Sequence, residues 1–358
     1  MFPSFDLPQP FLAAEADAAG LSERRRASAL RRGELTRLAP GLYAVGVDWE
    51  VLSPRERHIA TARAAVRAVP GAVLSHRSAA LIHGLPHPWG SLGAVRMTVL
   101  GDRRTSRAPA WVQLHRGLTP AAHLVPHELL TRDLTRTAEG EVLLTTPTRT
   151  VIDCFREERL PDGVAIGDGA LREGLTSPQR LRAMRAFQTR WPGVTKAAHG
   201  IPLLDGRREN WLESRSAAAL WGCGIPLGVP QVVVLDELRR FVARVDMAWP
   251  EQGVVGEADG RGKYLGEFDD GLDDSARSAS LRVVAAGARE SRIRDLGLEV
   301  VRWDPHEIVH TPGVVADRWE AAAARARSRR VTALLECSCC RTPLTCCAKP
   351  TGSPLTER

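Results

Sequence analysis

The sequence predicts an α/β protein built from three successive parts, and three observations support this fold class. Helical and strand patterns alternate along 358 residues, a length sufficient for two or three domains. A helix, a turn, a helix and a short hairpin are expected within residues 1–50. From Glu209 onward the pattern is helix, three strands, helix, strand and helix. An α/β middle domain is expected between these parts, over residues 51–190.

The composition is that of a globular protein with a basic charge. Hydrophobic residues make up 44% and charged residues 25% of the chain, the net charge is +7, and the pI is near 9.4. A basic balance favours an anionic partner such as double-stranded DNA. The N-terminus lacks the basic start of a signal peptide, and no apolar run approaches the roughly 20 residues of a membrane span. We therefore expect a cytoplasmic protein that does not contact membranes.

Residues 1–50 have the pattern of a winged helix-turn-helix DNA-binding domain. A short helix is expected over residues 9–19, and a turn then places Ser22 at the N-cap of a second helix over residues 23–32. A small hairpin follows over residues 34–45. In this arrangement the second helix enters the major groove and the hairpin contacts the backbone. The alternative is a small structural domain with a solvated arginine face. The expected DNA contacts are Arg24, Arg25, Arg26, Arg31, Arg32 and Arg37.

The middle region, residues 51–190, contains no catalytic constellation. His76 and His83 lie seven residues apart and so share one face of a helix. Without a third ligand, this spacing indicates packing or capping rather than a metal site. Residues 191–204 are typical of a linker, since Pro and Gly recur there. The middle region is therefore expected to act as a scaffold that joins the two ends.

Acidic residues gather near the strand ends of the C-terminal region. The alternation over residues 241–264 predicts a hairpin, with Asp246 at the end of one strand and Glu257 at the end of its partner. Asp259 shares the face of Glu257 because side chains alternate along a strand. Glu213 lies on the preceding amphipathic helix. Carboxylate oxygens are the ligands that Mg²⁺ prefers, so the pattern favours a metal site, with solvated turn residues as the alternative.

The element order over residues 205–333, αβββαβ, corresponds to the core of the restriction-endonuclease-like, or PD-(D/E)xK, nucleases. In that fold, acids on the first helix and on two strands bind Mg²⁺, and a lysine positions the attacking water. The resemblance assigns metal binding to Glu213, Asp246 and Glu257, and catalysis to Asp246, Glu257 and Lys263. Asp259 is a further candidate metal ligand, because it shares the face of Glu257. Asp259 occupies the usual position of the lysine. Lys263 would then reach back from the next turn, or Arg289 or Arg292 would substitute for it.

Four segments carry a more specific resemblance. They are residues 75–80 (SHRSAA), 146–153 (TPTRTVID), 245–250 (VDMAWP) and 257–260 (EADG). Together they resemble a large actinobacterial family that joins an AbiEi-type antitoxin winged helix to a C-terminal domain similar to the very-short-patch-repair endonucleases. Members of that family act as antitoxins or transcriptional regulators of type IV toxin-antitoxin systems by binding operator DNA. The resemblance extends to about residue 330.

These features predict a DNA-binding transcriptional regulator or antitoxin of a type IV toxin-antitoxin-like system. Its expected partners are double-stranded DNA and a cognate toxin protein. The first alternative is an active Mg²⁺-dependent DNA endonuclease in repair or phage defence, with Mg²⁺ as its cofactor. The second is a non-catalytic DNA clamp or protein-interaction module. Residues 334–358 are expected to form a disordered tail, because their cysteines are spaced too irregularly for a zinc site.

Overall fold

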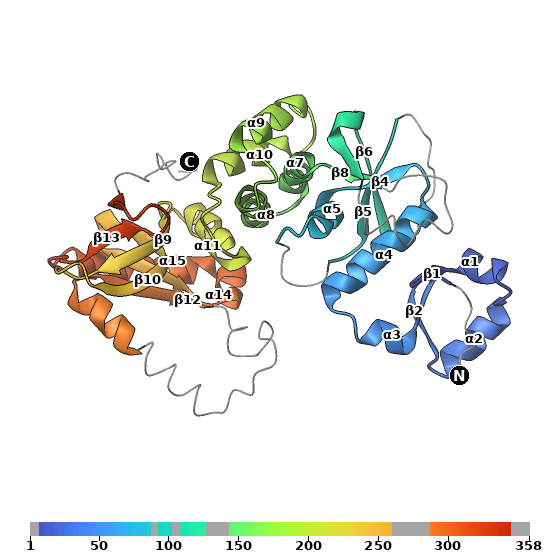
Figure 1. The fold of residues 1–358 in the computed structure, drawn as a ribbon, viewed down its shortest axis with the longest axis horizontal. Coiled ribbons are helices and arrows are strands. Elements are labelled where there is room, and N and C mark those ends of the chain that lie inside the picture. Colours follow the sequence, from blue (N-terminus) through green and yellow to red (C-terminus); the bar gives the residue numbers. More distant parts are fainter. Residues whose placement is uncertain (1–6, 87–91, 102–107, 127–142, 260–286, 345–358) are drawn as a thin grey trace. The chain divides into compact units, whose positions relative to one another are not determined.

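The structure, a computed structural model, describes residues 7–86, 92–101, 108–126, 143–259 and 287–344 (Figure 1). It contains one antiparallel sheet of three strands and two mixed sheets of five strands, so the predicted α/β class is confirmed. Within the described ranges, no helix combines the length and the apolar character that crossing a membrane requires. The chain divides into two compact units. The first is Met1–Glu157 with Leu175–Val194, and the second is Glu158–Gly174 with Thr195–Arg358.

The N-terminal part of the first unit contains two helices followed by a hairpin. Its elements are β1 (Phe11–Leu12), α1 (Ala13–Ala18), α2 (Glu23–Arg31), β2 (Leu35–Ala39), β3 (Leu42–Val45) and α3 (Gly46–Glu50). The first helix begins later than expected because Phe11 and Leu12 pair with β3 as a third strand. Gly20, with a φ of 81°, allows the tight turn between the helices. Phe11, Ala16, Leu21, Ala29 and Leu35 form the small buried core of this part.

The rest of the first unit surrounds a five-stranded sheet with the order β6-β5-β4-β8-β7. Its elements are α4 (Pro54–Ala68), β4 (Ala72–Leu74), α5 (His76–Ile82), β5 (Val95–Val99), β6 (Val112–Arg116), η1 (Ala121–His123), β7 (Leu124–Pro126), β8 (Leu143–Thr145), α7 (Pro147–Glu157) and α9 (Pro178–Phe187). Helix α4 begins with a capping box between Ser53 and Glu56, and Pro54 occupies its first position. Figure 1 shows α4 and α5 beside this sheet, and both pack against β5.

The segment of residues 146–153 has a structural role. Arg149 and Asp153 are both buried, and Arg149 Nε donates to Asp153 Oδ2 at 2.7 Å. Gln188 Nε2 donates to the other oxygen of Asp153 at 3.0 Å. The Trp191 ring lies 4.7 Å from the Arg149 guanidinium and 5.0 Å from that of Arg156. This buried network of ion pairs, hydrogen bonds and cation–π contacts connects α7 to the residues at the end of α9.

Residues 191–204 do not form the expected linker. They contain α10 (Val194–Gly200) and η2 (Ile201–Leu203), and Ala197 and Leu203 are buried. A side chain on Gly167, in helix α8 (Leu160–Arg172), would lie 2.6 Å from Leu204, so the two segments pack closely. The Pro and Gly content suggested an extended segment, but apolar residues at helical spacing decide the structure.

The second unit contains the predicted order of helix, three strands, helix, strand and helix. Its elements after η2 are α11 (Trp211–Gly222), β9 (Val229–Leu235), β10 (Phe241–Trp249), η3 (Pro250–Gln252), β11 (Val254–Ala258), a helix over residues 287–295, β12 (Glu299–Trp303), α14 (Pro305–His310), α15 (Pro312–Ala326) and β13 (Leu334–Cys337). The sheet order is β12-β11-β10-β9-β13, and only β11 and β12 pair in parallel. Trp249 and Trp303 belong to a core with α11, α14 and α15, whereas Ile293 and Val245 belong to a separate core.

Two parts of the second unit differ from the sequence prediction. Helix α8 belongs to this unit, rather than to the middle region, because it packs against α11. Arg208 Nη1 donates to Asp168 of α8 at 2.7 Å in a buried pair. The expected disordered tail is wrong for residues 334–344, because β13 pairs with β9 as an edge strand and Cys337 is buried. Residues 345–358 lie outside the described ranges.

Candidate functional site

Helix α2 and the hairpin present exposed arginines. Arg24, Arg25 and Arg31 are exposed on or at the ends of α2, and Arg37 is exposed on β2. Among the described residues, no acidic side chain forms an ion pair with these four arginines. Their charges are therefore available to an anionic partner.

Arg26 does not belong to this surface, in contrast to its expected role in DNA contact. Its side chain is 5% exposed and donates to the carboxylate of Asp17 and, at 2.6 Å, to the carbonyl oxygen of Leu21. The hydrogen bond to Asp17 raises the pKa of Arg26. Its guanidinium lies 5.8 Å from the centroid of the Tyr43 ring. Arg26 therefore connects α1, α2 and β3 internally.

Arg32 is exposed, but the neighbouring carboxylate of Glu34 partly neutralises its charge. Its Nη2 lies 2.6 Å from Glu34 Oε2. The hydrogen bond from Arg32 lowers the pKa of Glu34, which keeps that carboxylate ionised. Of the six arginines predicted to contact DNA, two are paired with an acid, and one of these two is also buried.

Glu213 lies in the first turn of α11 and is 2% exposed. Its Oε2 accepts hydrogen bonds from the Glu209 backbone at 2.8 Å and from Gln231 Nε2 at 2.7 Å, and its Oε1 accepts from Asn210 Nδ2 at 2.5 Å. Burial is the main reason that its pKa rises to about 7, and the charge of Asp246 raises it further. The three donors oppose this rise.

Glu257, on β11, is also buried, and two guanidinium groups hold it. Arg289 Nη2 donates to its two oxygens at 2.9 and 2.7 Å, and Arg302 Nη2 lies 2.8 Å from Oε2. Arg302 also reaches Asp259, with 3.0 Å between Nη1 and Oδ2. Burial raises the pKa of Glu257, and Arg302 and Arg289 oppose this effect. Asp259 therefore serves as an ion-pair partner of Arg302.

Asp246 connects the other two acids. Its Oδ2 accepts a hydrogen bond from the Ala258 backbone at 2.8 Å, which ties β10 to the end of β11. The charge of Asp246 raises the pKa of both Glu213 and Glu257. The predicted acids therefore lie in one electrostatic neighbourhood of the second unit.

These acids do not form a ready metal cluster. In the described part of the chain, two groups of three side chains place ligand atoms within 4.8 Å of one another, and neither group includes these acids. Lys263 lies outside the described residues. Of the two arginines considered as substitutes for lysine, Arg289 contacts Glu257, whereas Arg292 is exposed.

Of the two groups with ligand-like geometry, the sequence argued against one because of its irregular spacing, and it did not connect the members of the other. One is Cys337, Cys339 and Cys340, and the other is His76, His115 and Glu157. His76 and His83 do not converge, because His83 Nε2 lies 2.8 Å from the Thr145 carbonyl oxygen. His76 instead stacks on His115, with 3.9 Å between ring centroids. The members of this group come from three separate elements, so no spacing in the sequence could reveal it.

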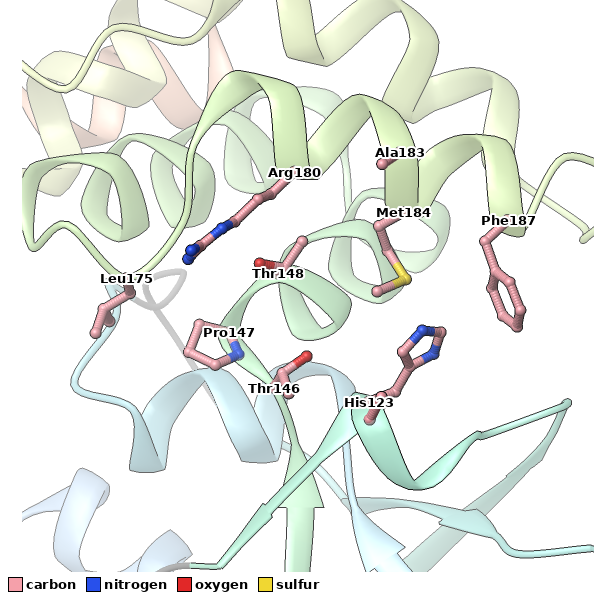
Figure 2. Close-up of a pocket in the computed structure, with 10 residues that line it drawn as sticks. His123, Thr146, Pro147, Thr148, Leu175, Arg180, Ala183, Met184 and Phe187 are labelled. Atoms are coloured by element: carbon pink, nitrogen blue, oxygen red, sulfur yellow. The ribbon is translucent and has the colours of Figure 1, made fainter.

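A pocket of about 460 Å³ lies within the first unit (Figure 2). Figure 2 shows Arg180 extending from α9 toward Pro147 and Thr148 at the start of α7. On the other side, Arg149 Nη1 donates to His123 Nδ1 at 3.3 Å, so a neutral His123 carries its hydrogen on Nε2. The pocket volume is within the usual range of small-molecule sites. Its lining is Ala122, His123, Thr146, Pro147, Thr148, Leu175, Arg180, Ala183, Met184 and Phe187.

Comparison with known proteins found sequence relatives of unassigned function. The chain is 26% identical over 210 residues to the uncharacterized proteins MT2308 and Rv2248 of two Mycobacterium tuberculosis strains, which covers 59% of this chain and 72% of each relative. The crystal structure of the RV2827C protein from Mycobacterium tuberculosis aligns with a TM-score of 0.31 and 20% identity, over 56% of this chain and 69% of that one. No family description matched the sequence.

Proposed function

We propose that this protein is a DNA-binding transcriptional regulator of the antitoxin type, and that its N-terminal domain is a winged helix-turn-helix. The observation that supports the proposal is the set of three exposed arginines on α2, directly before the β2–β3 hairpin, that form no ion pair with a described acidic side chain: Arg24, Arg25 and Arg31. An α-helix fits the major groove, and a following hairpin can contact the adjacent backbone. A cognate toxin protein is the second partner that this proposal includes.

Arginine chemistry suits this role. A guanidinium group donates in a fork that matches phosphate oxygens and the edge of guanine, and it stays charged at every relevant pH. Arg37 would add a phosphate contact from the hairpin. Arg26 would support these contacts indirectly, because it anchors α2 to α1 from the inside.

The test is DNA affinity of the full chain for its own promoter fragment, measured against salt concentration. The triple variant R24A/R25A/R31A is expected to bind more weakly, and the slope of log K against log salt should fall by about 2.7, at 0.9 for each lost phosphate contact. The matched control is R180A/R182A/R190A, which removes three exposed arginines of the same unit and should keep the slope. An unchanged affinity in the first variant would refute the proposed binding surface.

A second candidate function is Mg²⁺-dependent DNA cleavage by a restriction-endonuclease-like domain in the second unit. The observation that favours it is the αβββαβ order together with the shared electrostatic neighbourhood of Glu213, Asp246 and Glu257. Binding of Mg²⁺ would require Glu257 to exchange Arg289 and Arg302 for the ion. Such an exchange is costly unless the ion compensates the buried charge.

Cleavage of plasmid and mismatched DNA with Mg²⁺ or Mn²⁺ tests this second candidate. An active endonuclease should cut in the wild type, and D246N should abolish cutting, whereas E251Q, which changes an exposed acid beside the same hairpin, should not. Absence of cutting, together with metal binding that D246A leaves unaltered, would exclude the candidate and leave a non-catalytic clamp or interaction module. An adjacent gene for a nucleotidyltransferase-like toxin would support the antitoxin role, and one for a DNA methyltransferase would support the endonuclease.

A further inference from the structure

Three side chains of the first unit converge from different elements. His76 begins α5, His115 lies in β6, and Glu157 ends α7. Each offers a ligand atom within 4.8 Å of those of the other two. Glu157 Oε1 lies 3.0 Å from His115 Nδ1 and 3.9 Å from His76 Nε2. Two imidazoles and one carboxylate therefore face a common point.

The two histidines have nitrogen atoms without hydrogen-bond partners among the described residues. His76 is 2% exposed, and the Nε2 atoms of both His76 and His115 are buried without a partner. His115 Nδ1, at 3.0 Å from Glu157 Oε1, faces the same point; without a cation it donates to the carboxylate, and a bound cation would replace that proton. A buried polar atom without a partner is unfavourable unless something satisfies it. A cation bound between the two rings and the carboxylate would satisfy His76 Nε2.

The surroundings keep both rings neutral, which is the form that binds metals. Burial and the charges of nearby arginines lower the pKa of His115 to about 4 and that of His76 well below its ordinary value. Ser75 Oγ lies 2.9 Å from His76 Nδ1 and orients the ring from outside the cluster, as the outer hydrogen bonds of metal-binding histidines do.

The arginines around the cluster are the opposing influence, and one carboxylate compensates part of their charge. Arg149 and Arg156 pair with Asp153 at 2.7 and 3.1 Å. Arg96 remains, with Nη1 at 3.8 Å from Glu157 Oε2, so it competes with a cation for that carboxylate.

We infer that His76, His115 and Glu157 bind one divalent transition-metal ion, with Zn²⁺ as the best match. Two neutral imidazoles and a carboxylate are a donor set of zinc sites that keep a further position for water. Mg²⁺ and Ca²⁺ fit poorly, because they prefer sites made of oxygen ligands. This site is separate from the proposed DNA surface and from the acids of the second unit.

The experiment must separate this site from the cysteine group, which also suits Zn²⁺. The full chain is therefore titrated calorimetrically with Zn²⁺ in a background variant in which Cys337, Cys339, Cys340, Cys346 and Cys347 are replaced by Ser. One Zn²⁺ per chain is expected. H115Q and E157Q should each lower the affinity at least about tenfold, and R96Q should raise it. The matched control H83Q changes a histidine of the same unit that lies outside the cluster and should leave binding unchanged.

Two results would overturn the inference: no Zn²⁺ binding in the serine background, or equal affinity in the background, H115Q and E157Q. Circular dichroism checks that each variant is folded. If the serine background does not fold, the wild-type chain is titrated with Co²⁺, whose near-ultraviolet charge-transfer band marks binding by thiolates and whose visible bands arise from every bound ion. A visible component that is not accompanied by the thiolate band and that H115Q removes supports the site; its absence from the wild type, or its persistence in H115Q, refutes the site.

Discussion

Replacing Glu213 by Gln should change how the stability of the second unit depends on pH. In the unfolded chain this carboxyl has its ordinary pKa of 4.5, whereas burial raises the pKa to about 7 in the folded chain. Between these values the folded chain keeps a proton that the unfolded chain has lost. The free energy of unfolding therefore falls as the pH rises through this window, and the loss is complete above pH 7.

The size of this effect follows from the two pKa values. At 1.36 kcal/mol for each pH unit, the difference corresponds to about 3 kcal/mol as an upper limit. E213Q removes the titrating group. The free energy of unfolding of the variant, relative to that of the wild type, should therefore rise by up to about 3 kcal/mol between pH 4.5 and pH 8. This rise is expected whatever the difference between the two proteins at pH 4.5.

Urea unfolding at several pH values, followed by tryptophan fluorescence, measures this difference. The second unit contains Trp211, Trp221, Trp249, Trp303 and Trp319. A difference between variant and wild type that stays constant from pH 4.5 to pH 8 would refute the reasoning. It would mean that the donors Asn210, Gln231 and the Glu209 backbone outweigh burial and keep Glu213 ionised. Added Mg²⁺ should flatten the wild-type profile if it binds this carboxylate, since binding stabilises the ionised folded form.

Three further predictions concern packing and titration elsewhere. R26A should destabilise the N-terminal domain by about 1–3 kcal/mol, because it removes a buried donor from a backbone carbonyl, whereas the exposed control R25A should change stability by less than about 0.5 kcal/mol in thermal unfolding. G256A should cost about 1–3 kcal/mol in urea unfolding, because the new Cβ would lie 2.6 Å from the Trp303 ring; a neutral result would show that the ring can move. The first unit should lose stability as the pH falls from 6.5 toward 4, because His115 gains a proton in this range in the unfolded chain but not in the folded chain. Thermal unfolding at several pH values measures this loss, and a variant H115Q with the same pH dependence as the wild type would contradict it.

The sequence predicted the elements of the second unit well, for a local reason. The run Val232–Val234 and the alternation before Trp249 determine buried strands whatever lies around them. The same reasoning failed at residues 191–204, where Pro and Gly suggested a linker but buried apolar side chains form α10 and η2. It also failed at β13, because pairing with β9 depends on the edge of a distant strand.

The candidate site residues also fall into those that the sequence predicted and those whose surroundings only the structure revealed. The sequence identified the arginines of α2 and the acids of the second unit from residue type and position. It did not distinguish Arg26, which is buried, from Arg25, which is exposed, although the two are adjacent in the chain. It also placed Asp259 in a metal set, whereas the folded chain pairs it with Arg302 across neighbouring strands.

By itself, the sequence determined the α/β class, the order of most elements and the set of charged residues available for function, because helix and strand periodicity are local properties. Only the tertiary structure decided which of those charges meet. It buries Arg26 against Asp17, holds Glu257 between two guanidinium groups, and brings His76 and His115 to Glu157. Such contacts join residues far apart in the chain, and they form where packing removes water and each buried charge or lone pair then needs a partner.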